Sequence, residues 1–261
     1  MGPHAQPLRK DRDAHVDWSE LTLTHRCNQR CFFCYEEGRD IAKEPPLAEV
    51  KRLLDETRKR AKQVVLCGKE VVLRQDILDI VSYAASIGLR VAVFSNGQAF
   101  ARRELVHELA EAGCSSVVIS FHFPDPEALA RGAGVHPKCF GRILAGFDNI
   151  RGYIAAHSRR TIDFSIETDM FILNAGRLAQ MRRTLRGALG ETGWSMRLGC
   201  LMPAKVSDIG IPHVLEPLAA RREEIAAFVR THPSRIPLNF VKVPLCMLPP
   251  DAVHRSLDVQ Y

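Results

Sequence analysis

Three cysteines stand close together near the start of the chain, and their spacing is the most informative feature of the sequence. Cys27, Cys31 and Cys34 follow the pattern C-x3-C-x2-C, with an aromatic residue on each side of the third cysteine. Three thiolates within eight residues can all reach one metal centre. A [4Fe–4S] cluster normally takes four cysteine ligands, so three local ligands leave one iron open to a cofactor or substrate. Such an open position is typical of a reactive metal site.

Other uses of cysteine fit this spacing less well. Structural zinc needs a second Cys or Cys/His pair at a set distance. No such pair follows here, although His25 stands two residues before Cys27. The three cysteines are too crowded to pair well as disulfides, and the other five of the chain's eight cysteines are scattered. The pattern therefore favours an iron–sulfur site.

The elements that must position these cysteines alternate along the chain. Apolar strand-like runs are followed by amphipathic helical runs, which predicts parallel strands joined by right-handed crossovers. The predicted strands are Ser19–Thr24, Gln63–Cys67, Arg90–Ser95, Ser116–Phe121, Ile162–Thr168 and Ser195–Leu201. The predicted helices between them are Leu47–Ala61, Arg74–Ile87, Ala101–Ala112, Cys139–His157 and Asn174–Leu189. The fold class is therefore α/β, either a (βα)6 partial barrel or an open doubly wound sheet.

In either topology, functional residues gather at the carboxyl ends of the strands. Short polar motifs fall at those ends. They are the cysteines after the first strand, Gly68-Lys69-Glu70 after the second, Ser95-Asn96-Gly97 after the third, Ser120 to His122 after the fourth, and Glu167 on the fifth. We expect these motifs to meet at one rim.

This set of motifs resembles the radical S-adenosylmethionine (radical SAM) superfamily, and the resemblance runs from about Trp18 to Pro203. It decides for a partial (βα)6 TIM-type barrel with a short C-terminal extension. In that superfamily three cysteines hold a [4Fe–4S] cluster, and its open iron chelates SAM. One electron cleaves SAM to methionine and a 5′-deoxyadenosyl radical, which abstracts hydrogen from the substrate. The cofactors carry the difficult chemistry, while the protein binds and shields them.

The resemblance implies roles for particular residues, each of which has an ordinary structural alternative as a turn, rim or core residue. Cys27, Cys31 and Cys34 are the expected cluster ligands. Gly68-Lys69-Glu70 takes the place of the Gly-Gly-Glu motif that meets the methionine amine, and departs from it at Lys69 and at Val71, where proline is usual. The other expected cofactor contacts are Phe33, Tyr35, Asn96, Ser120, Glu167 and Met202.

Two residues are candidates for chemistry on the substrate. Cys246 can donate a hydrogen atom to a substrate radical, as in some radical epimerases of the superfamily, and Cys67 and Cys200 also fall near the predicted rim. His122 can bind substrate or act as an acid or base. A buried structural role is the alternative for each of them. A glycine-rich loop, Arg131 to Gly141, is expected to cover the site.

Length and composition limit the number of domains and the class of protein. The chain has 261 residues, 46% of them hydrophobic and 25% charged, which suits one large globular domain. We divide it into a flexible lead-in (1–17), a barrel core (18–205) and a C-terminal helix and extended tail that close the barrel (206–261). No stretch approaches the roughly 18 apolar residues of a membrane helix. Reduced cysteines, an oxygen-sensitive cluster and no signal peptide together predict a cytoplasmic location.

The net charge of +6 does not by itself indicate nucleic-acid binding. The arginine pairs are spread over separate predicted helices, and acidic residues stand beside several of them. No aromatic residues interleave with them as a base-stacking surface requires. Solvated helix faces explain the charge better.

The sequence thus predicts a radical SAM enzyme acting in peptide or natural-product modification, with flavodoxin or ferredoxin as a typical reductant. A peptide substrate is favoured because the tail, Pro244 to Pro249, resembles those of peptide-modifying maturases. A small metabolite and modified RNA are alternatives. The altered Gly-Lys-Glu motif also keeps open a different class, an electron-transfer or regulatory iron–sulfur protein that binds no SAM.

Overall fold

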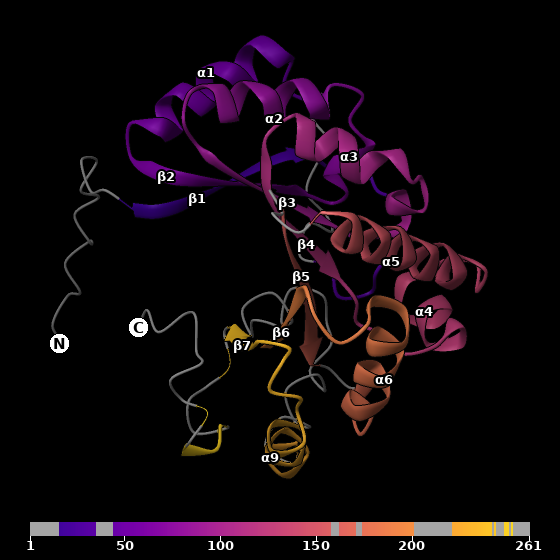
Figure 1. Cartoon of the computed structure of the whole chain (residues 1–261). Helices are drawn as coiled ribbons and strands as arrows, with labels where there is room; N and C mark the ends of the chain where they lie inside the picture. The colour runs from indigo at the N-terminus through magenta and orange to yellow at the C-terminus, as the bar shows by residue number, and fades with distance from the viewer. Residues whose placement is uncertain are drawn as a thin grey trace, which may run out of the picture.

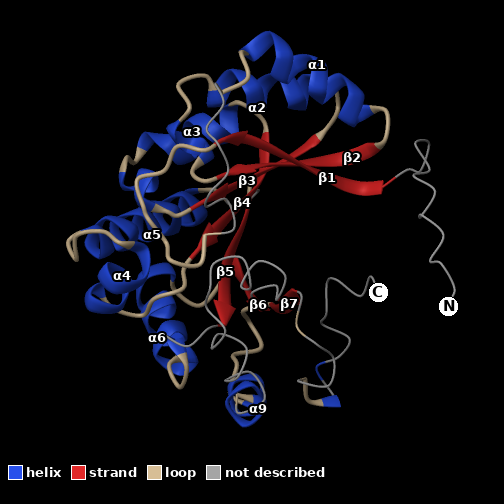
Figure 2. Cartoon of the chain, turned by 180° about the vertical axis from the view of Figure 1, so that it is seen from behind, coloured by secondary structure: helices blue, strands red, loops and turns tan. Residues whose placement is uncertain are grey.

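Residues 16–34, 44–157, 162–170, 174–200, 221–241, 243, 248–250 and 252 are described by a computed structural model of the chain. Within these residues, seven strands form one sheet in the order β1 to β7, and every neighbouring pair is parallel. The sheet turns progressively from β1 to β7, and α1 to α6 follow its convex side (Figures 1 and 2). The α/β partial barrel predicted from the sequence is therefore confirmed.

The elements follow one another as strand and helix along most of the chain. The strands are β1 Val16–Thr24, β2 Ala61–Gly68, β3 Arg90–Ser95, β4 Cys114–Ser120, β5 Asp163–Met170, β6 Trp194–Cys200 and β7 Leu238–Val241. The helices are α1 Leu47–Arg58, α2 Ile77–Ser86, α3 Glu104–Glu111, α4 Pro126–Ala133, α5 Cys139–Ala156, α6 Leu178–Leu189 and α9 Arg222–Arg230. Two 3₁₀ turns, η1 Val71–Leu73 and η2 Gln98–Ala101, follow β2 and β3.

The two faces of the sheet differ because successive side chains on a strand point to opposite faces. On β5, Phe164, Ile166 and Met170 belong to the main hydrophobic core, which includes the buried faces of the helices. The alternate residues, Ser165 and Glu167, therefore occupy the concave face. The concave face is thus polar on β5.

Helix α4 is an element that the sequence analysis missed. Asp125 caps its N-terminus by accepting the Ala128 N–H at 2.8 Å, and Pro126 occupies the first helical position. Aspartate at the N-cap and proline at the first helical position are both favoured at the start of a helix. The loop expected from Arg131 to Gly141 is consequently shorter, because its first three residues form the last turn of α4.

The sheet also continues beyond the six strands expected. β7 pairs in parallel with β6 through Met196 and Leu238. It lies in the C-terminal part, 206–261, for which a helix and an extended tail were predicted. None of the helices in the described ranges is long and apolar enough to cross a membrane.

Candidate active site

The cysteine loop, residues 26–34, leaves the carboxyl end of β1 and runs along the end of α4. The Arg30 N–H donates to Ala133 O at 2.7 Å, and the Phe32 N–H donates to Gly132 O at 3.1 Å. The last carbonyls of a helix lack partners within the helix, so they are free to accept these bonds. Only glycine fits at position 132, because a Cβ there would lie 2.0 Å from the Phe123 ring. Helix α4 therefore fixes the course of the loop.

The three predicted cluster ligands are half-buried in this loop, and other groups of the protein contact them. The Gln29 N–H donates to Cys27 Sγ at 3.3 Å, and the Asn96 amide approaches the same sulfur at 3.8 Å. The Cys31 thiol donates to Gln29 Oε1 at 3.3 Å. Across the described residues, no three His, Cys, Asp or Glu side chains converge closely enough to hold a metal ion.

Electrostatics bear on whether these cysteines suit an iron–sulfur cluster. Burial, together with the charges of Cys27 and Cys34 nearby, raises the pKa of Cys31 to about 12. Three thiolates this close need a positive centre in order to ionise together. The irons of a [4Fe–4S] cluster supply that charge and take thiolate ligands. On chemical grounds the donor set fits the cluster.

The Gly68-Lys69-Glu70 turn is joined directly to the base of the cysteine loop. The Lys69 N–H donates to Thr24 O and the Glu70 N–H donates to Arg26 O, each at 3.0 Å. Gly68 has φ +132°, and a Cβ there would lie 2.3 Å from Thr24 O. Glycine is required at this position because both the backbone conformation and the close approach exclude a side chain. At Lys69, where the resembled motif has a second glycine, it is the backbone N–H that makes the bond to Thr24.

Glu70 is the most unusual titratable group of the site. Its side chain is buried, at 1% exposure, and Oε2 accepts the Asn96 N–H at 2.6 Å. The other oxygen, Oε1, is also buried and has no hydrogen-bond partner among the described residues. Burial raises the pKa of Glu70 to about 7, although the donors of Asn96, Ser95 and Val72 oppose the shift. A buried carboxylate oxygen with spare acceptor capacity suits an ammonium group, so the residue fits the methionine amine of SAM.

Asn96 links the third strand to the other two motifs. Its backbone N–H binds Glu70, and its side-chain amide donates to Asn28 Oδ1 at 2.7 Å. Gly97 follows with φ +85° and begins η2. The structure therefore brings the cysteine loop, Glu70 and the Asn-Gly turn together, as the strand-end pattern predicted.

Phe33 of the cysteine loop belongs to an aromatic cluster with His122 and Phe123. The rings of Phe33 and His122 are perpendicular, with centroids 5.2 Å apart, and Phe123 lies 6.0 Å from Phe33. His122 Nδ1 accepts the Asp169 N–H at 3.0 Å. Burial lowers the pKa of His122 to about 4, against the opposing charge of Glu167. His122 is therefore neutral at pH 7 and ties β4 to β5.

Polar residues pair across β4, β5 and β6 on the concave face. Ser120 is in register with Glu167, and Glu167 is in register with Arg197. The Glu167 and Arg197 side chains form an ion pair at 3.5 Å between Oε2 and Nε. Arg197 was not among the site residues predicted from the sequence. The alternation Ser195, Arg197, Gly199 on a predicted strand was the signal that could have placed it beside Glu167.

The structure says little or nothing about the site roles predicted for the remaining residues. Tyr35, Met202 and Cys246 lie outside the described residues, so their roles stay predictions. Cys200 ends β6. Cys67 is buried on β2, and its thiol donates to Leu21 O at 3.5 Å.

Comparison with known proteins agrees with the fold and the site. The model of the radical SAM superfamily matches residues 21–162, which is more than half of the 261 residues. The chain belongs to this superfamily of enzymes.

Two curated relatives illustrate the range of the family. A probable GTP 3′,8-cyclase of Thermococcus kodakarensis is 36% identical over 118 residues, which cover 44% of this chain and 38% of that protein. An Fe-coproporphyrin III synthase of Methanosarcina barkeri is 33% identical over 120 residues, covering 45% and 29%. The chain thus matches less than half the length of either relative.

Solved structures also resemble the chain. SuiB of Streptococcus suis bound to S-adenosylmethionine has a TM-score of 0.67 at 13% identity, and the match covers 90% of this chain and 52% of SuiB. SuiB bound to the precursor peptide SuiA gives the same TM-score over 87% of this chain and 49% of SuiB. At this identity, the similarity shows a shared fold.

Proposed function

We propose that the chain is a radical SAM enzyme that holds a [4Fe–4S] cluster through Cys27, Cys31 and Cys34 and binds SAM beside Glu70. When bound, these cofactors supply a one-electron cleavage that produces a hydrogen-abstracting radical. The observation that carries the proposal is the buried Oε1 of Glu70, which lacks a partner among the described residues. This carboxylate lies in a turn hydrogen-bonded to the base of the cysteine loop.

Different residues of the site bind the cofactors and shield them from water. Glu70 accepts the ammonium group of SAM, and its own orientation is fixed by the Asn96 N–H. Asn96 also holds the cysteine loop through Asn28 and approaches Cys27, so the same residue contacts both halves of the cofactor site. Ser120 and Glu167 are proposed to contact the ribose, because they share one row of the concave face. Phe33 of the cysteine loop packs near Phe123, and the two rings are proposed to limit access of water.

A peptide in a modification pathway is our first proposal for the substrate. The resemblance of the tail to peptide-modifying maturases supports it, and the structurally similar SuiB is known with a precursor peptide bound. A small metabolite is the second candidate, because two relatives that are 36% and 33% identical are named for GTP and coproporphyrin chemistry. Flavodoxin or ferredoxin is the proposed reductant in either case.

SAM binding separates this proposal from an iron–sulfur carrier or sensor. Anaerobically reconstituted protein would be reduced, and the electron paramagnetic resonance (EPR) spectrum of its cluster recorded with and without SAM. We expect SAM to change the spectrum of the wild type, and Glu70→Gln to need at least about tenfold more SAM, because it loses a charge-assisted hydrogen bond. A normal cluster whose EPR spectrum does not change when SAM is added would refute the proposal. It would favour an iron–sulfur electron carrier or sensor instead.

A further inference from the structure

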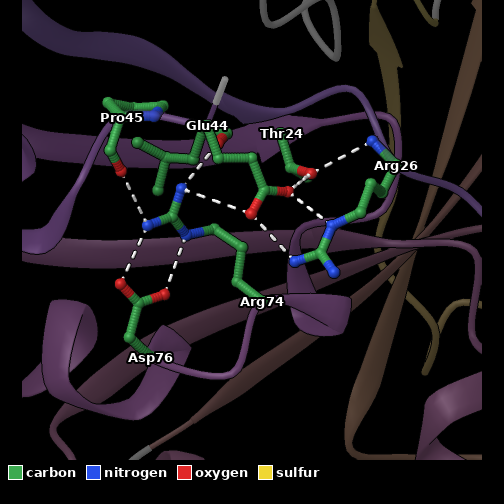
Figure 3. Close-up of polar contacts among 7 residues, drawn as sticks. Thr24, Arg26, Glu44, Pro45, Arg74 and Asp76 are labelled. Carbon is green, nitrogen blue, oxygen red and sulfur yellow. Dashed lines mark hydrogen bonds and ion pairs between the residues drawn. The ribbon is translucent and has the colours of Figure 1, made fainter. Parts of the chain in front are cut away.

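Both ends of the cysteine-bearing stretch are tied together by an ionic cluster formed by Thr24, Arg26, Glu44, Pro45, Arg74 and Asp76, which we term the Arg74 network (Figure 3). Arg26 directly precedes Cys27, and Glu44 stands ten residues after Cys34. The Arg26 guanidinium donates to both oxygens of Glu44, from Nε at 2.7 Å and from Nη2 at 2.8 Å. Thr24 also donates to Glu44. This bidentate pair joins the residue before Cys27 to Glu44.

Arg74 is the buried centre of the network. Its side chain is 3% exposed, and Nη1 donates to Leu23 O at 2.9 Å while Nη2 donates to Pro45 O at 3.0 Å. Its Nε and Nη2 also bind the two carboxylate oxygens of Asp76, at 2.9 and 2.8 Å. One guanidinium therefore joins the end of β1, the return of the cysteine-bearing stretch and the start of α2.

The charge of Arg74 is balanced where it lies. Asp76 neutralises it directly, and Glu44 Oε2 lies 4.0 Å from Nη1. Burial alone favours the neutral acid of Glu44, but hydrogen bonds from Arg26 and Thr24 hold its pKa below the usual value. Glu44 is therefore ionised at pH 7, and the network of two cations and two anions has no net charge.

The same network reaches the turn that carries Glu70. Arg74 is four residues beyond Glu70 and follows η1 directly. The Glu70 N–H in turn binds Arg26 O at 3.0 Å. The backbone of the turn and the backbone of the cysteine loop thus share one set of anchors.

We propose that Arg74 is a positioning residue that holds the cysteine loop and the Glu70 turn in a fixed relation to each other. This inference rests on the proposed function. Anchoring the chain directly before Cys27 removes conformational freedom from the start of the cysteine loop. The planar guanidinium donates to four oxygens of three residues in fixed directions, whereas a lysine ammonium is a point charge on a flexible stem. Arg74 therefore places the two halves of the SAM site rather than only stabilising the fold.

Arg74→Lys tests the inference, because it keeps the positive charge but loses the planar guanidinium that donates to several acceptors at once. Glu44→Gln is a milder second variant at a quarter-exposed side chain. Arg221→Lys is the matched control: Arg221 is also 3% exposed and binds Asn174 and Glu224, in a cluster around α9. For each reconstituted protein, bound iron and sulfide, the melting temperature and the dissociation constant of SAM would be measured, together with the EPR change that SAM induces.

We expect Arg74→Lys to keep its iron content, to weaken SAM binding about tenfold and to reduce the EPR change. Glu44→Gln should act in the same direction, whereas Arg221→Lys should lower the melting temperature comparably but bind SAM as the wild type does. Normal SAM binding by Arg74→Lys, or an equal loss in Arg221→Lys, would overturn the positioning role. A wild type that forms a cluster but binds no SAM would overturn the proposed function and this inference with it.

Discussion

The buried carboxylate of Glu70 makes a prediction that needs no cofactor. Its pKa of about 7 in the fold lies above the value of 4.5 that a glutamate has in water. Ionising Glu70 therefore opposes folding. The raised pKa contributes stability that is fully present below pH 4.5, where Glu70 is protonated in both states, and that is lost as pH rises through 7. Glu70→Gln removes this titration. The variant apoprotein should become more stable relative to wild type as pH increases, at the same time as it loses affinity for SAM.

The size of the effect follows from the two pKa values. The shift in the pKa of Glu70 from 4.5 to about 7 lowers the free energy of unfolding by about 3 kcal/mol in total. This is the change between a pH at which Glu70 is protonated in both states and a pH at which it is ionised in both. Between pH 5.5 and pH 8, where the measurement is practical, about 2 kcal/mol of that difference should develop. The comparison of two pH values cancels the constant cost of burying the glutamine amide.

Urea unfolding of both apoproteins at several pH values measures this difference directly. Glu56→Gln is the control, because hydrogen bonding to Lys59 lowers the pKa of Glu56 below its usual value of 4.5. Glu56 is therefore ionised in both the folded and the unfolded protein from pH 5.5 to 8, so the difference between Glu56→Gln and wild type should stay constant over this range. The free energy of unfolding of Glu70→Gln minus that of wild type should rise steadily from pH 5.5 to 8. A difference that stays constant over this range would refute the assignment of Glu70 as a buried, raised-pKa acid.

Two further predictions concern groups around the site. Gly68→Ala places a Cβ 2.3 Å from Thr24 O at a φ of +132°, so urea unfolding should show a loss of about 2–4 kcal/mol. Gly152→Ala, in α5 with nothing within 4 Å, should be neutral or stabilising, and equal effects of the two changes would contradict the argument. His122, with a pKa of about 4, should show no imidazole titration by NMR between pH 8 and 5.5. Because its folded pKa is depressed, its contribution to stability is lost as pH falls from about 6.5 toward 4, and a titration midpoint near 6.5 would exclude its burial as a neutral ring.

Much of the fold could be predicted from the sequence because the signals are local. The strand Arg90–Ser95 was predicted with its observed bounds, since an apolar run there ends at an Asn-Gly turn. The meeting of the cysteines, Glu70 and Asn96 followed from one rule, that parallel strands present their carboxyl ends at one rim. The helix start at Asp125-Pro126 was also a local signal, and it was overlooked.

The remaining contacts depend on register and packing between distant segments. Arg197 meets Glu167 because β5 and β6 pair in one particular register. Arg74 binds the carbonyl of Leu23, which is 51 residues away, and that of Pro45, 29 residues away. No spacing within the sequence reports which carbonyl a buried guanidinium will reach. The unpartnered oxygen of Glu70 likewise becomes visible only when every neighbouring donor has been placed.

The central claim is that this chain performs radical SAM chemistry, and product analysis tests it most directly. Reconstituted, reduced protein would be incubated anaerobically with SAM and assayed by chromatography for 5′-deoxyadenosine, beside a variant with Cys27, Cys31 and Cys34 all changed to alanine. We predict 5′-deoxyadenosine from the wild type and none from the triple variant. A wild type that assembles its cluster and binds SAM yet forms no 5′-deoxyadenosine would contradict the account.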